Sequence, residues 1–458
     1  QNLYNQSTTF QMHFSTIIIA NIAEAFEGSI NKMRSLEKRR ARIGIEHGLC
    51  DRTLLWGGDN KVVVTPFPIS PEIFKKNSGV FSFKNVINLS PRRSGVSLSE
   101  AILKDKNLLE DLTEVIRNNP GIEVSPYCIT EKFLSLVNFL AQKNLRFSVK
   151  QKPVYGNSHW LVSYLDSKVG SRMEIGGIRH CSVRVPESMV CGTREEVMHT
   201  LMWFYDRKKS CVVKANFGES GWGLIMLPRG RFKSAGDVMR HVCEEFEKDS
   251  IWQDGLILVE EYIESDGSYG TSPSSELYVD EHGAKITYVC DQVLGTGGTF
   301  LGVALGKNVL SEKIKKQIRI ASFQVGKKFW KMGYRGFFDI DFVVSKEGVP
   351  FVIETNMRRT GGTHTYDAVR RLTGKHWENT VFSISLDNFK YGEKRLAEKE
   401  ILGKMKSILY PINGQGNGVI VSIVDRKQPT FGFIIIEKSR EEAIKMHSKI
   451  LTYWGMKK

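Results

Sequence analysis

Two carboxylates and a carboxamide have the types and spacing of a metal site. Asp341 lies in one apolar run, and a turn at 345–348 connects this run to a second one that ends in Glu354 and Asn356. A hairpin formed by the two runs brings Asp341 and Glu354 to roughly opposite positions, and Asn356 shares the face of Glu354. Such oxygen ligands suit Mg²⁺, which binds one or two carboxylates together with substrate phosphates. The apolar flanking residues disfavour the alternative, a solvent-facing charged hairpin.

A glycine-rich turn between two other apolar runs could hold phosphate groups. The first run contains Lys214, and the turn that follows contains Gly218, Gly221 and Gly223. Backbone N–H groups of such a turn can approach phosphate oxygens, and the lysine adds a positive charge. The chain has no Gly-Lys-Ser/Thr sequence, so this is not a Walker A loop. Taken alone, such a glycine-rich hairpin is more often a tight structural turn than a phosphate site.

A cation follows the predicted metal ligands directly. Arg358 stands two residues after Asn356, where a guanidinium could hold a transferring phosphoryl group or an acyl phosphate. Arg359 could serve instead, or it is simply exposed. The residues 361–364 then lead into a predicted helix, whose free N–H groups can bind a carboxylate. No Ser/His/Asp or Cys/His arrangement is apparent, so a nucleophilic side chain is not expected.

The elements that must position these residues differ along the chain. The first 45 residues read as one amphipathic helix with a basic end at 38–42. Short β-type runs then alternate with helical stretches at 97–118 and 130–143, which predicts an α/β unit with a parallel sheet. Hairpin-like strands and two helices follow up to about residue 380. The remainder predicts a smaller α+β region with two strands and a final helix.

Composition and charge restrict the class of protein. The 458 residues are 41% hydrophobic and 25% charged, which excludes a disordered chain. No apolar run reaches the roughly 18 residues of a membrane-spanning helix. Seven scattered cysteines without a Cys-x-x-Cys pair predict a cytoplasmic protein with neither disulfides nor zinc. The net charge of +15 favours anionic partners, and the basic run at 38–42 is either a solvated face or a docking surface. Nucleic acid is not favoured, because no recognition helix or RNA-binding aromatic motif is apparent.

Together these motifs resemble those of the ATP-grasp carboxylate ligases, over about half of the chain. The preceding α/β unit resembles a pre-ATP-grasp domain, and the last region resembles the small C-terminal domain of the natural-product peptide ligases of the pheganomycin and butirosin types. The implied fold class is therefore α/β and α+β. The implied domains are a basic amphipathic helix (1–45), a pre-ATP-grasp α/β domain (46–160), an ATP-grasp domain of two α+β subdomains (161–380) and a C-terminal α+β domain (381–458).

The resemblance also implies roles for individual residues. Asp341, Glu354 and Asn356 would bind Mg²⁺, for which Mn²⁺ can substitute, and Arg358 would steady an acyl phosphate. Asp339, where relatives usually carry a small or basic residue, would be a further metal ligand or a perturber of a local pKa. The residues implied to bind ATP are Lys168, Lys214, Gly218, Gly221, Gly223, Glu276 near the ribose or a metal, and an adenine hinge of Glu260, Glu261, Tyr262 and Ile263. The catalytic residues implied are Arg358, Lys214 and Asn356.

The implied reaction joins a carboxylate, such as that of an amino acid, to an amine. ATP activates the carboxylate as an acyl phosphate, and the amine then displaces phosphate. One alternative is transfer of an amino acid to the thiol, or to the bound amine, of an acidic acyl-carrier protein, which the positive charge would suit. Another is a small-molecule kinase with the same nucleotide site. Antibiotic biosynthesis is the expected context, and the glycine-rich segment 291–302 is the predicted substrate loop.

Overall fold

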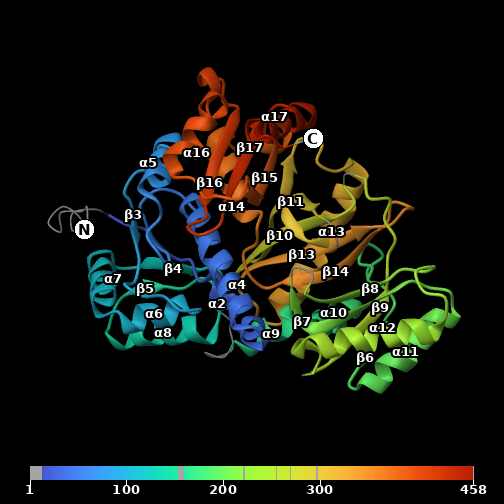
Figure 1. The fold of residues 1–458 in the computed structure, drawn as a ribbon. Coiled ribbons are helices and arrows are strands. Elements are labelled where there is room, and N and C mark those ends of the chain that lie inside the picture. Colours follow the sequence, from blue (N-terminus) through green and yellow to red (C-terminus); the bar gives the residue numbers. More distant parts are fainter. Residues whose placement is uncertain are drawn as a thin grey trace.

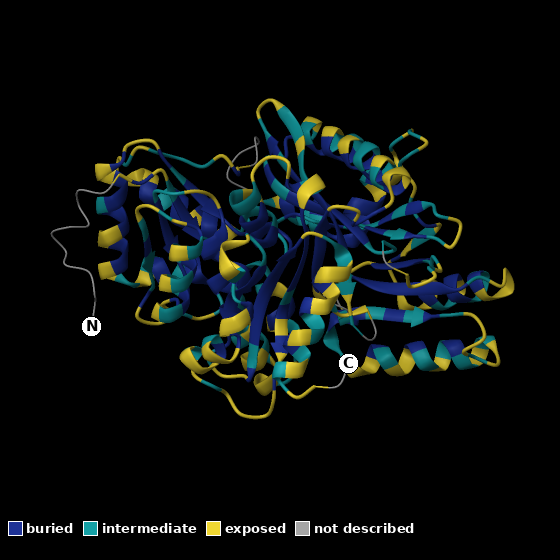
Figure 2. Ribbon diagram, turned by 90° about the horizontal axis from the view of Figure 1, so that it is seen from above, coloured by how far each residue is buried: buried dark blue, intermediate teal, exposed yellow. Residues whose placement is uncertain are grey.

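Three β-sheets organise the chain in a computed structural model that describes residues 13–152, 159–219, 222–253, 255–268, 270–295 and 298–456. A parallel sheet near the N-terminus lies on one side of the molecule, and two antiparallel sheets make up the rest (Figure 1). The predicted combination of an α/β unit with α+β regions is confirmed. In Figure 2 the strands lie in the buried interior, and exposed residues gather on the outer faces of helices and on loops. Within the described ranges, no helix is both long and apolar enough to cross a membrane.

The N-terminal unit is a five-stranded sheet in the order β3-β2-β1-β4-β5, and all of its pairings are parallel. Parallel neighbours need crossover connections, which helices provide here. The α/β unit expected from alternating runs is therefore present. Its strands are β1 (Thr16–Ile19), β2 (Lys61–Val64), β3 (Val86–Leu89), β4 (Ile122–Pro126) and β5 (Phe147–Ser148), and its helices include α5 (Pro71–Val80), α6 (Leu98–Lys104), α7 (Lys106–Asn118) and α8 (Glu131–Gln142).

The prediction of a single helix over residues 1–45 is wrong for the described residues from 13 onward. The apolar run at 16–19 is β1, the central strand, which pairs with β2 on one edge and β4 on the other. A short apolar run does not distinguish a buried strand from a helix by period alone, and its β-branched isoleucines fit a strand buried on both faces. The helices that follow are α2 (Ile22–Ala25), α3 (Glu27–Lys32) and α4 (Leu36–Leu49), and α4 contains the basic run.

One of the short β-type runs from which strands are predicted, at 53–56, is not a strand in the structure. It lies mostly in the 3-10 helix η1 (Cys50–Leu55), whose residues are all buried. Thr53, Leu54, Leu55 and Trp56 have strand-forming side chains, but the buried segment satisfies its backbone locally, with the Trp56 N–H donating to the Thr53 carbonyl at 3.1 Å. Packing of this turn against β16 and α14, rather than strand propensity, sets its conformation.

The largest sheet has eight antiparallel strands in the order β14-β13-β10-β11-β12-β15-β17-β16. The strands at 418–424 and 430–437, predicted in a separate C-terminal domain, extend this sheet through β15 instead of forming their own. Its strands are β10 (Pro273–Asp280), β11 (Gly283–Leu294), β12 (Phe300–Gly306), β13 (Gly336–Val344), β14 (Pro350–Asn356), β15 (Phe382–Lys390), β16 (Gly418–Val424) and β17 (Thr430–Glu437). The helices beside it are α13 (Glu312–Lys331), α14 (Thr363–Thr373), α15 (Trp377–Thr380), α16 (Glu398–Lys404) and α17 (Arg440–Tyr453).

The third sheet has four antiparallel strands in the order β6-β9-β7-β8 and carries the glycine-rich turn between β7 and β8. Its own apolar core contains Val213, Phe204, Val242 and Phe246, from the strands and from the two helices packed on it. The elements of this region are α9 (Trp160–Asp166), α10 (Lys168–Gly176), β6 (Ser188–Cys191), α11 (Arg194–Asp206), β7 (Cys211–Glu219), β8 (Trp222–Leu227), α12 (Ala235–Lys248) and β9 (Ile257–Glu261).

Candidate active site

The predicted metal ligands meet at one end of the β13–β14 hairpin. Asp341 pairs directly with Glu354, and Asp339 pairs with Asn356, so the predicted cross-strand arrangement is confirmed. The Asn356 Nδ2 donates to Asp341 Oδ2 at 2.9 Å, and the Gln292 Nε2 on β11 donates to Asp341 Oδ1 at 2.5 Å. The hairpin therefore brings two carboxylates and one carboxamide together, as their spacing predicts.

Burial and like charges set the electrostatics of this cluster. Burial raises the pKa of Asp341 well above its usual range, and the neighbouring Asp339 and Glu354 raise it further. Burial also raises the pKa of Asp339, which accepts hydrogen bonds from the Ser274 hydroxyl at 2.6 Å. Asp339 thus acts on its neighbour's pKa, one of the two roles considered for it.

The donor chemistry fits a divalent cation. Carboxylates that are buried side by side repel one another, and a cation relieves that repulsion. Among the described residues, no third His, Cys, Asp or Glu converges with Asp341 and Glu354 to make a three-residue metal group. The Asn356 carboxamide would then supply the third protein oxygen, and Mg²⁺ is a cation that accepts so few protein ligands because phosphates and water complete its shell.

Two lysines predicted to contact phosphates lie against the same strand end. The Lys168 Nζ, at the first residue of α10, donates to Glu354 Oε1 at 2.8 Å and to the Gly218 carbonyl at 2.7 Å. The Lys214 Nζ, on β7, forms an ion pair with Glu260 and donates to the Ile353 carbonyl at 3.5 Å. Both lysines are buried. Although burial alone raises the pKa of Glu354, Lys168 and Lys214 hold it below its usual range.

Arg172 belongs to this cluster, although the motifs did not single it out. Its Nη2 pairs with Glu260 Oε2 at 2.5 Å, and its Nη1 donates to the Val352 carbonyl at 3.0 Å. The side chain therefore ties α10 to β9 in the four-stranded sheet and to β14 in the eight-stranded sheet. One signal was available in the sequence, since Lys168 and Arg172 are four residues apart and share a helix face.

The predicted adenine hinge has most of its polar groups engaged. The Glu260 carboxylate is held by Arg172 and Lys214. The N–H of Glu261 donates to the Glu187 carbonyl at 2.8 Å, and that of Tyr262 donates to the Ser210 carbonyl at 2.9 Å. Ile263 follows, half-buried. Glu260 therefore positions cations, and contact of residues 261–263 with adenine stays a prediction.

The glycine-rich turn is a tight crossing of backbones. A Cβ on Gly218 would lie 2.5 Å from the Trp222 carbonyl oxygen, and Gly223 has a φ of +76°. Both positions therefore need glycine for conformational reasons alone. Gly221 lies outside the described residues. The carbonyl of Gly218 faces Lys168, so the turn is adjacent to the predicted phosphate lysines, but phosphate binding by its N–H groups stays a prediction.

The two arginines after Asn356 have different surroundings. Arg358 lies 3.4 Å from Asp166 Oδ1, and its guanidinium stacks over the Phe26 ring at 4.9 Å. The guanidinium of Arg359 lies between the Trp56 and Phe337 rings, 4.9 and 3.7 Å from the ring centres. The expectation that Arg359 is simply exposed is wrong, because its guanidinium lies against two aromatic rings. Its contact with a phosphoryl group stays a prediction.

Glu276 lies one strand away from the predicted ligands. It pairs with Asp339 across β10 and β13, and it accepts hydrogen bonds from the hydroxyls of Thr363 and Thr287, the latter at 3.1 Å. Burial raises its pKa to about 7. Thr363 is the first residue of α14, so Glu276 lies beside this helix N-terminus through the Thr363 hydroxyl. Binding of a carboxylate by the helix N–H groups stays a prediction.

A cavity of about 490 Å³ opens beside these residues. Glu354, Asn356 and Arg358 form one end of it, and Phe217 lies at its side. Most of the remaining lining comes from α2, α3, α9 and the start of α8, and β7 and Ile251 also contribute. These elements lie at the junction of the parallel sheet and the four-stranded sheet (Figure 1). No described residue of the predicted substrate loop at 291–302 lines this cavity.

The basic run in α4 is partly engaged within the molecule. Arg39 donates to the Met33 and Asn31 carbonyls at 2.5 and 2.6 Å, and Arg42 pairs with Glu46 at 2.8 Å. Lys38 and Arg40 are exposed. The surface that could dock a partner is therefore smaller than the sequence indicates, since Arg39 holds the end of α3 and Arg42 is paired within α4.

Comparison with solved structures identifies the fold. Biotin carboxylase from Campylobacter jejuni in complex with β,γ-ATP aligns with a TM-score of 0.57 and 14% identity, over 96% of this chain and 92% of that one. The ADP complex of PurK, the N5-carboxyaminoimidazole ribonucleotide synthetase, aligns with a TM-score of 0.54 and 11% identity, over 97% of this chain and 98% of that one. The chain has the ATP-grasp fold. The ATP-grasp resemblance predicted from the order of the motifs is thereby confirmed.

A curated relative adds a sequence similarity to this ATP-grasp fold. The L-propargylglycine–L-glutamate ligase of Streptantibioticus cattleyicolor is 29% identical over 329 residues, which are 68% of this chain. The match spans 64% of that relative's length. No family model matches the chain. The relative and the structural neighbours are ATP-grasp ligases.

Proposed function

We propose that this ATP-grasp chain is an ADP-forming ligase that joins the carboxylate of an amino acid to an amine. The observation that carries the proposal is the meeting of three features around the end of β14, where Glu354, Asn356 and Arg358 line one cavity. These features are the predicted metal ligands on β13 and β14, the buried pair Lys168 and Lys214, and the cation Arg358. Phosphates and a carboxylate are the groups that such an end accommodates.

The two lysines would act by exchanging partners. In the structure each is neutralised by a glutamate, Lys168 by Glu354 and Lys214 by Glu260. Lysine is a compact charge on a flexible stem, so its ammonium can move to a phosphate without a change in the backbone. Mg²⁺, held by Asp341, Glu354 and Asn356, would neutralise phosphate charge as the phosphoryl group transfers.

The reaction would proceed in two balanced steps. A carboxylate oxygen of the substrate attacks the γ-phosphorus of ATP, and the bond to the β-phosphate oxygen breaks to release ADP. The amine nitrogen then attacks the carbonyl carbon of the acyl phosphate, phosphate leaves, and the nitrogen loses a proton to form the amide. Arg358 would hold the acyl phosphate, and the cavity walls would limit its hydrolysis. The chain thus positions and shields the reactants.

Product analysis tests this proposal. The purified chain is incubated with ATP, Mg²⁺ and L-amino acids, singly and in pairs, and with hydroxylamine as a general amine. We expect ADP and phosphate in equal amounts, and a product whose mass is the sum of acid and amine less one water. A phosphorylated product with ADP and no free phosphate would identify a kinase, and AMP would identify adenylation. No turnover with any pair would contradict the proposal.

A further inference from the structure

The lining of the cavity carries more acidic than basic side chains, and the predicted phosphate and metal binding does not account for this excess. The whole chain carries a net charge of +15. Yet the cavity lining contains five carboxylates, Glu24, Glu27, Glu131, Asp166 and Glu354, against three cations, Lys32, Lys132 and Arg358. An excess of negative charge in a basic protein favours a ligand with a positive group. Two of these carboxylates, Glu24 and Glu27, together with the neighbouring lining residue Thr130, are termed the acidic corner below.

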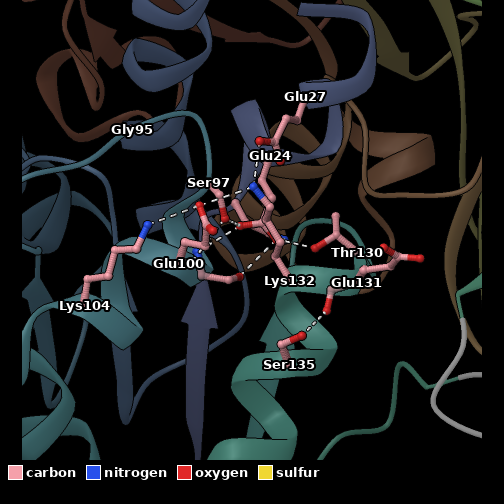
Figure 3. A network of polar contacts seen from close by, with 12 residues as sticks. Glu24, Glu27, Gly95, Ser97, Glu100, Lys104, Thr130, Glu131, Lys132 and Ser135 are labelled. Atoms are coloured by element: carbon pink, nitrogen blue, oxygen red, sulfur yellow. Dashed lines mark hydrogen bonds and ion pairs between the residues drawn. The ribbon is translucent and has the colours of Figure 1, made fainter. Parts of the chain in front are cut away.

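Glu24 is fixed in this corner by neutral donors (Figure 3). Its side chain is 4% exposed, and it is held by the hydroxyls of Ser97, Ser99 and Thr130, at 2.8 Å and 3.0 Å for the two serines. The Ser99 N–H donates at 2.8 Å, and the Asn21 amide donates at 3.2 Å. None of these partners carries a charge, so the negative charge of Glu24 is oriented but not neutralised.

The other carboxylates of the lining have basic partners. Glu27 pairs with Lys132 at 2.6 Å, Asp166 with Arg358 at 3.4 Å, and Glu354 with Lys168 at 2.8 Å. His159 lies 3.2 Å from Glu131. Over the described ranges, no lysine, arginine or histidine forms an ion pair with Glu24. Glu24 is thus the buried carboxylate of the lining whose charge remains for a ligand.

Thr130 connects Glu24 to the cavity. Its hydroxyl donates to Glu24 and accepts the Phe133 N–H at 3.0 Å, and Thr130 itself lines the cavity. A hydroxyl oxygen has two lone pairs, so one remains for a donor in the cavity. An ammonium placed there would contact the Thr130 oxygen and be attracted by the adjacent negative charge of Glu24. Glu24 is therefore a positioning residue that acts through Thr130.

Lys132 is not available to pair with the carboxylate of a ligand. Its Nζ contacts Glu27 at 2.6 Å and Glu100 at 3.3 Å, so two carboxylates already share its charge (Figure 3). The lining also includes the apolar side chains of Phe26, Phe217 and Ile251. The cavity thus combines the acidic corner, an apolar surface and the Arg358 guanidinium.

We infer that this cavity binds an α-amino acid, or the amino-terminal residue of a short peptide, with its ammonium at the acidic corner and its carboxylate toward Arg358. This inference rests on the proposed function, and it adds the residues that recognise the α-ammonium and the orientation of the amino acid in the cavity. An ammonium that leaves water is stabilised only where a carboxylate or an acceptor replaces its hydration, and the acidic corner supplies both. A carboxylic acid without the amino group would leave the charge of Glu24 unpaired.

Matched ligand pairs test the inference on the wild-type chain. Binding without nucleotide is measured for L-alanine and propanoate, L-norvaline and pentanoate, L-phenylalanine and 3-phenylpropanoate, and L-glutamate and glutarate. Each pair shares a carbon chain and differs by the α-ammonium. We expect at least one amino acid to bind about tenfold more tightly than its partner, as a charge-assisted hydrogen bond is worth more than about 1.5 kcal/mol. Equal or weaker binding of every amino acid would overturn the inference.

A substitution locates the recognition at the acidic corner. Glu24→Gln keeps the shape and removes the charge, and Glu437→Gln is its control, because Glu437 is also 4% exposed and is held by a neutral amide, that of Asn417 at 3.0 Å. We expect Glu24→Gln to lose the preference for the amino acid over its partner and to leave the KM for ATP unchanged. Parallel losses for both members of a pair would reveal a structural role and overturn the inference.

The outcomes for this inference and for the proposed function separate cleanly. Binding without ATP reports on the acidic corner, whereas ADP and phosphate release report on the chemistry at β14. Preference for the amino acid without turnover of ATP would support the inference and contradict the proposed function. Turnover of ATP with equal binding of both members of every pair would support the proposed function and contradict the inference. If Glu24→Gln does not fold, Thr130→Val is the second variant. It removes the connecting hydroxyl and, with it, the N-cap of α8, so its melting temperature is measured as well. It is expected to weaken binding of the amino acid but not of its des-amino partner.

Discussion

The two ends of the cavity hold their charges in opposite ways. At the β14 end, Lys168 pairs with Glu354, and Lys214 and Arg172 share Glu260, so each charged side chain contacts one of opposite sign. At the acidic corner, Glu24 is held by hydroxyls, an amide and a backbone N–H. The first arrangement can exchange partners, whereas the second fixes one charge in place.

This difference matches what each end must accommodate. ATP and a divalent cation bring several charges to the β14 end and remove them again, so ion pairs on flexible side chains can form and re-form there. The acidic corner needs one orientation of one group, and a network of neutral donors holds a carboxylate without cancelling its field. The partners of the buried charges thus distinguish a site that exchanges charged ligands from a site that only orients one charged group.

Glu354→Gln is expected to have the largest effect, because Glu354 is both a predicted metal ligand and the partner of Lys168. Turnover should fall by about 100-fold or more, the scale for removing a preorganised electrostatic group. Thermal stability should change little, since the Lys168 ammonium keeps the Gly218 carbonyl. Chelation of divalent cations in the wild type should have the same effect and be reversed by added Mg²⁺. Full activity of the variant would remove Glu354 from the metal site.

Lys214→Met tests the exchange of partners at the β14 end. Loss of a charge-assisted contact to phosphate costs about 1.5–3 kcal/mol, so the KM for ATP should rise roughly 10- to 100-fold. The preference for an amino acid over its des-amino partner in the absence of nucleotide should remain, because it depends on the other end. Isothermal titration with ATP measures the first effect. Wild-type affinity for ATP would contradict the role of Lys214.

Substitution of Arg172 is expected to have a smaller effect on ATP binding, and it distinguishes a residue that positions Glu260 from one that is only structural. Arg172→Met removes the link between β9 and β14 and leaves Glu260 with Lys214 alone, so the KM for ATP should rise about three- to tenfold with kcat reduced less. Arg172→Lys should recover part of the affinity, because it restores a cation beside Glu260. Equal losses in both variants, or a loss of folded protein without a change in KM, would show that Arg172 is only structural.

The smallest effects are expected on the surface of α4. Lys38→Glu combined with Arg40→Glu reverses the two exposed cations and spares Arg39 and Arg42, which hold local contacts. The melting temperature and the KM values for ATP and amino acids should stay near those of the wild type. A raised KM for an acyl-carrier protein that shrinks as salt increases would identify this surface as its docking site. Unchanged activity with every carrier tested would identify a solvated face.

The sequence predicted the hairpin chemistry well because local patterns determine it. The alternation in 336–344 and 350–356 fixes which side chains of β13 and β14 share a face, so the residue order alone places Asp341, Glu354 and Asn356 together. The strand at 16–19 could not be recognised, because its burial comes from two neighbouring strands that are distant in sequence. The docking of 418–424 and 430–437 onto β15 depends on long-range pairing in the same way.

The acidic corner could not be predicted for a related reason. Glu24 lies in a four-residue helix, and its partners Ser97, Ser99 and Thr130 come from segments that are more than 70 residues away. A lone glutamate near the N-terminus carries no local signal of a role. Arg358 was correctly placed near the predicted ligands, whereas Arg359 was not distinguishable from it, since only the positions of Trp56 and Phe337 separate the two.

The most direct test of the central claim follows oxygen from the substrate into phosphate. The amino acid with the highest turnover is prepared with both carboxylate oxygens as ¹⁸O and is incubated with the chain, ATP, Mg²⁺ and the amine. Mass spectrometry of the released phosphate then counts the label. Activation as an acyl phosphate predicts one ¹⁸O in each phosphate, because the attacking carboxylate oxygen leaves with the phosphorus. Unlabelled phosphate formed together with the amide would contradict carboxylate activation at the β14 end of the cavity.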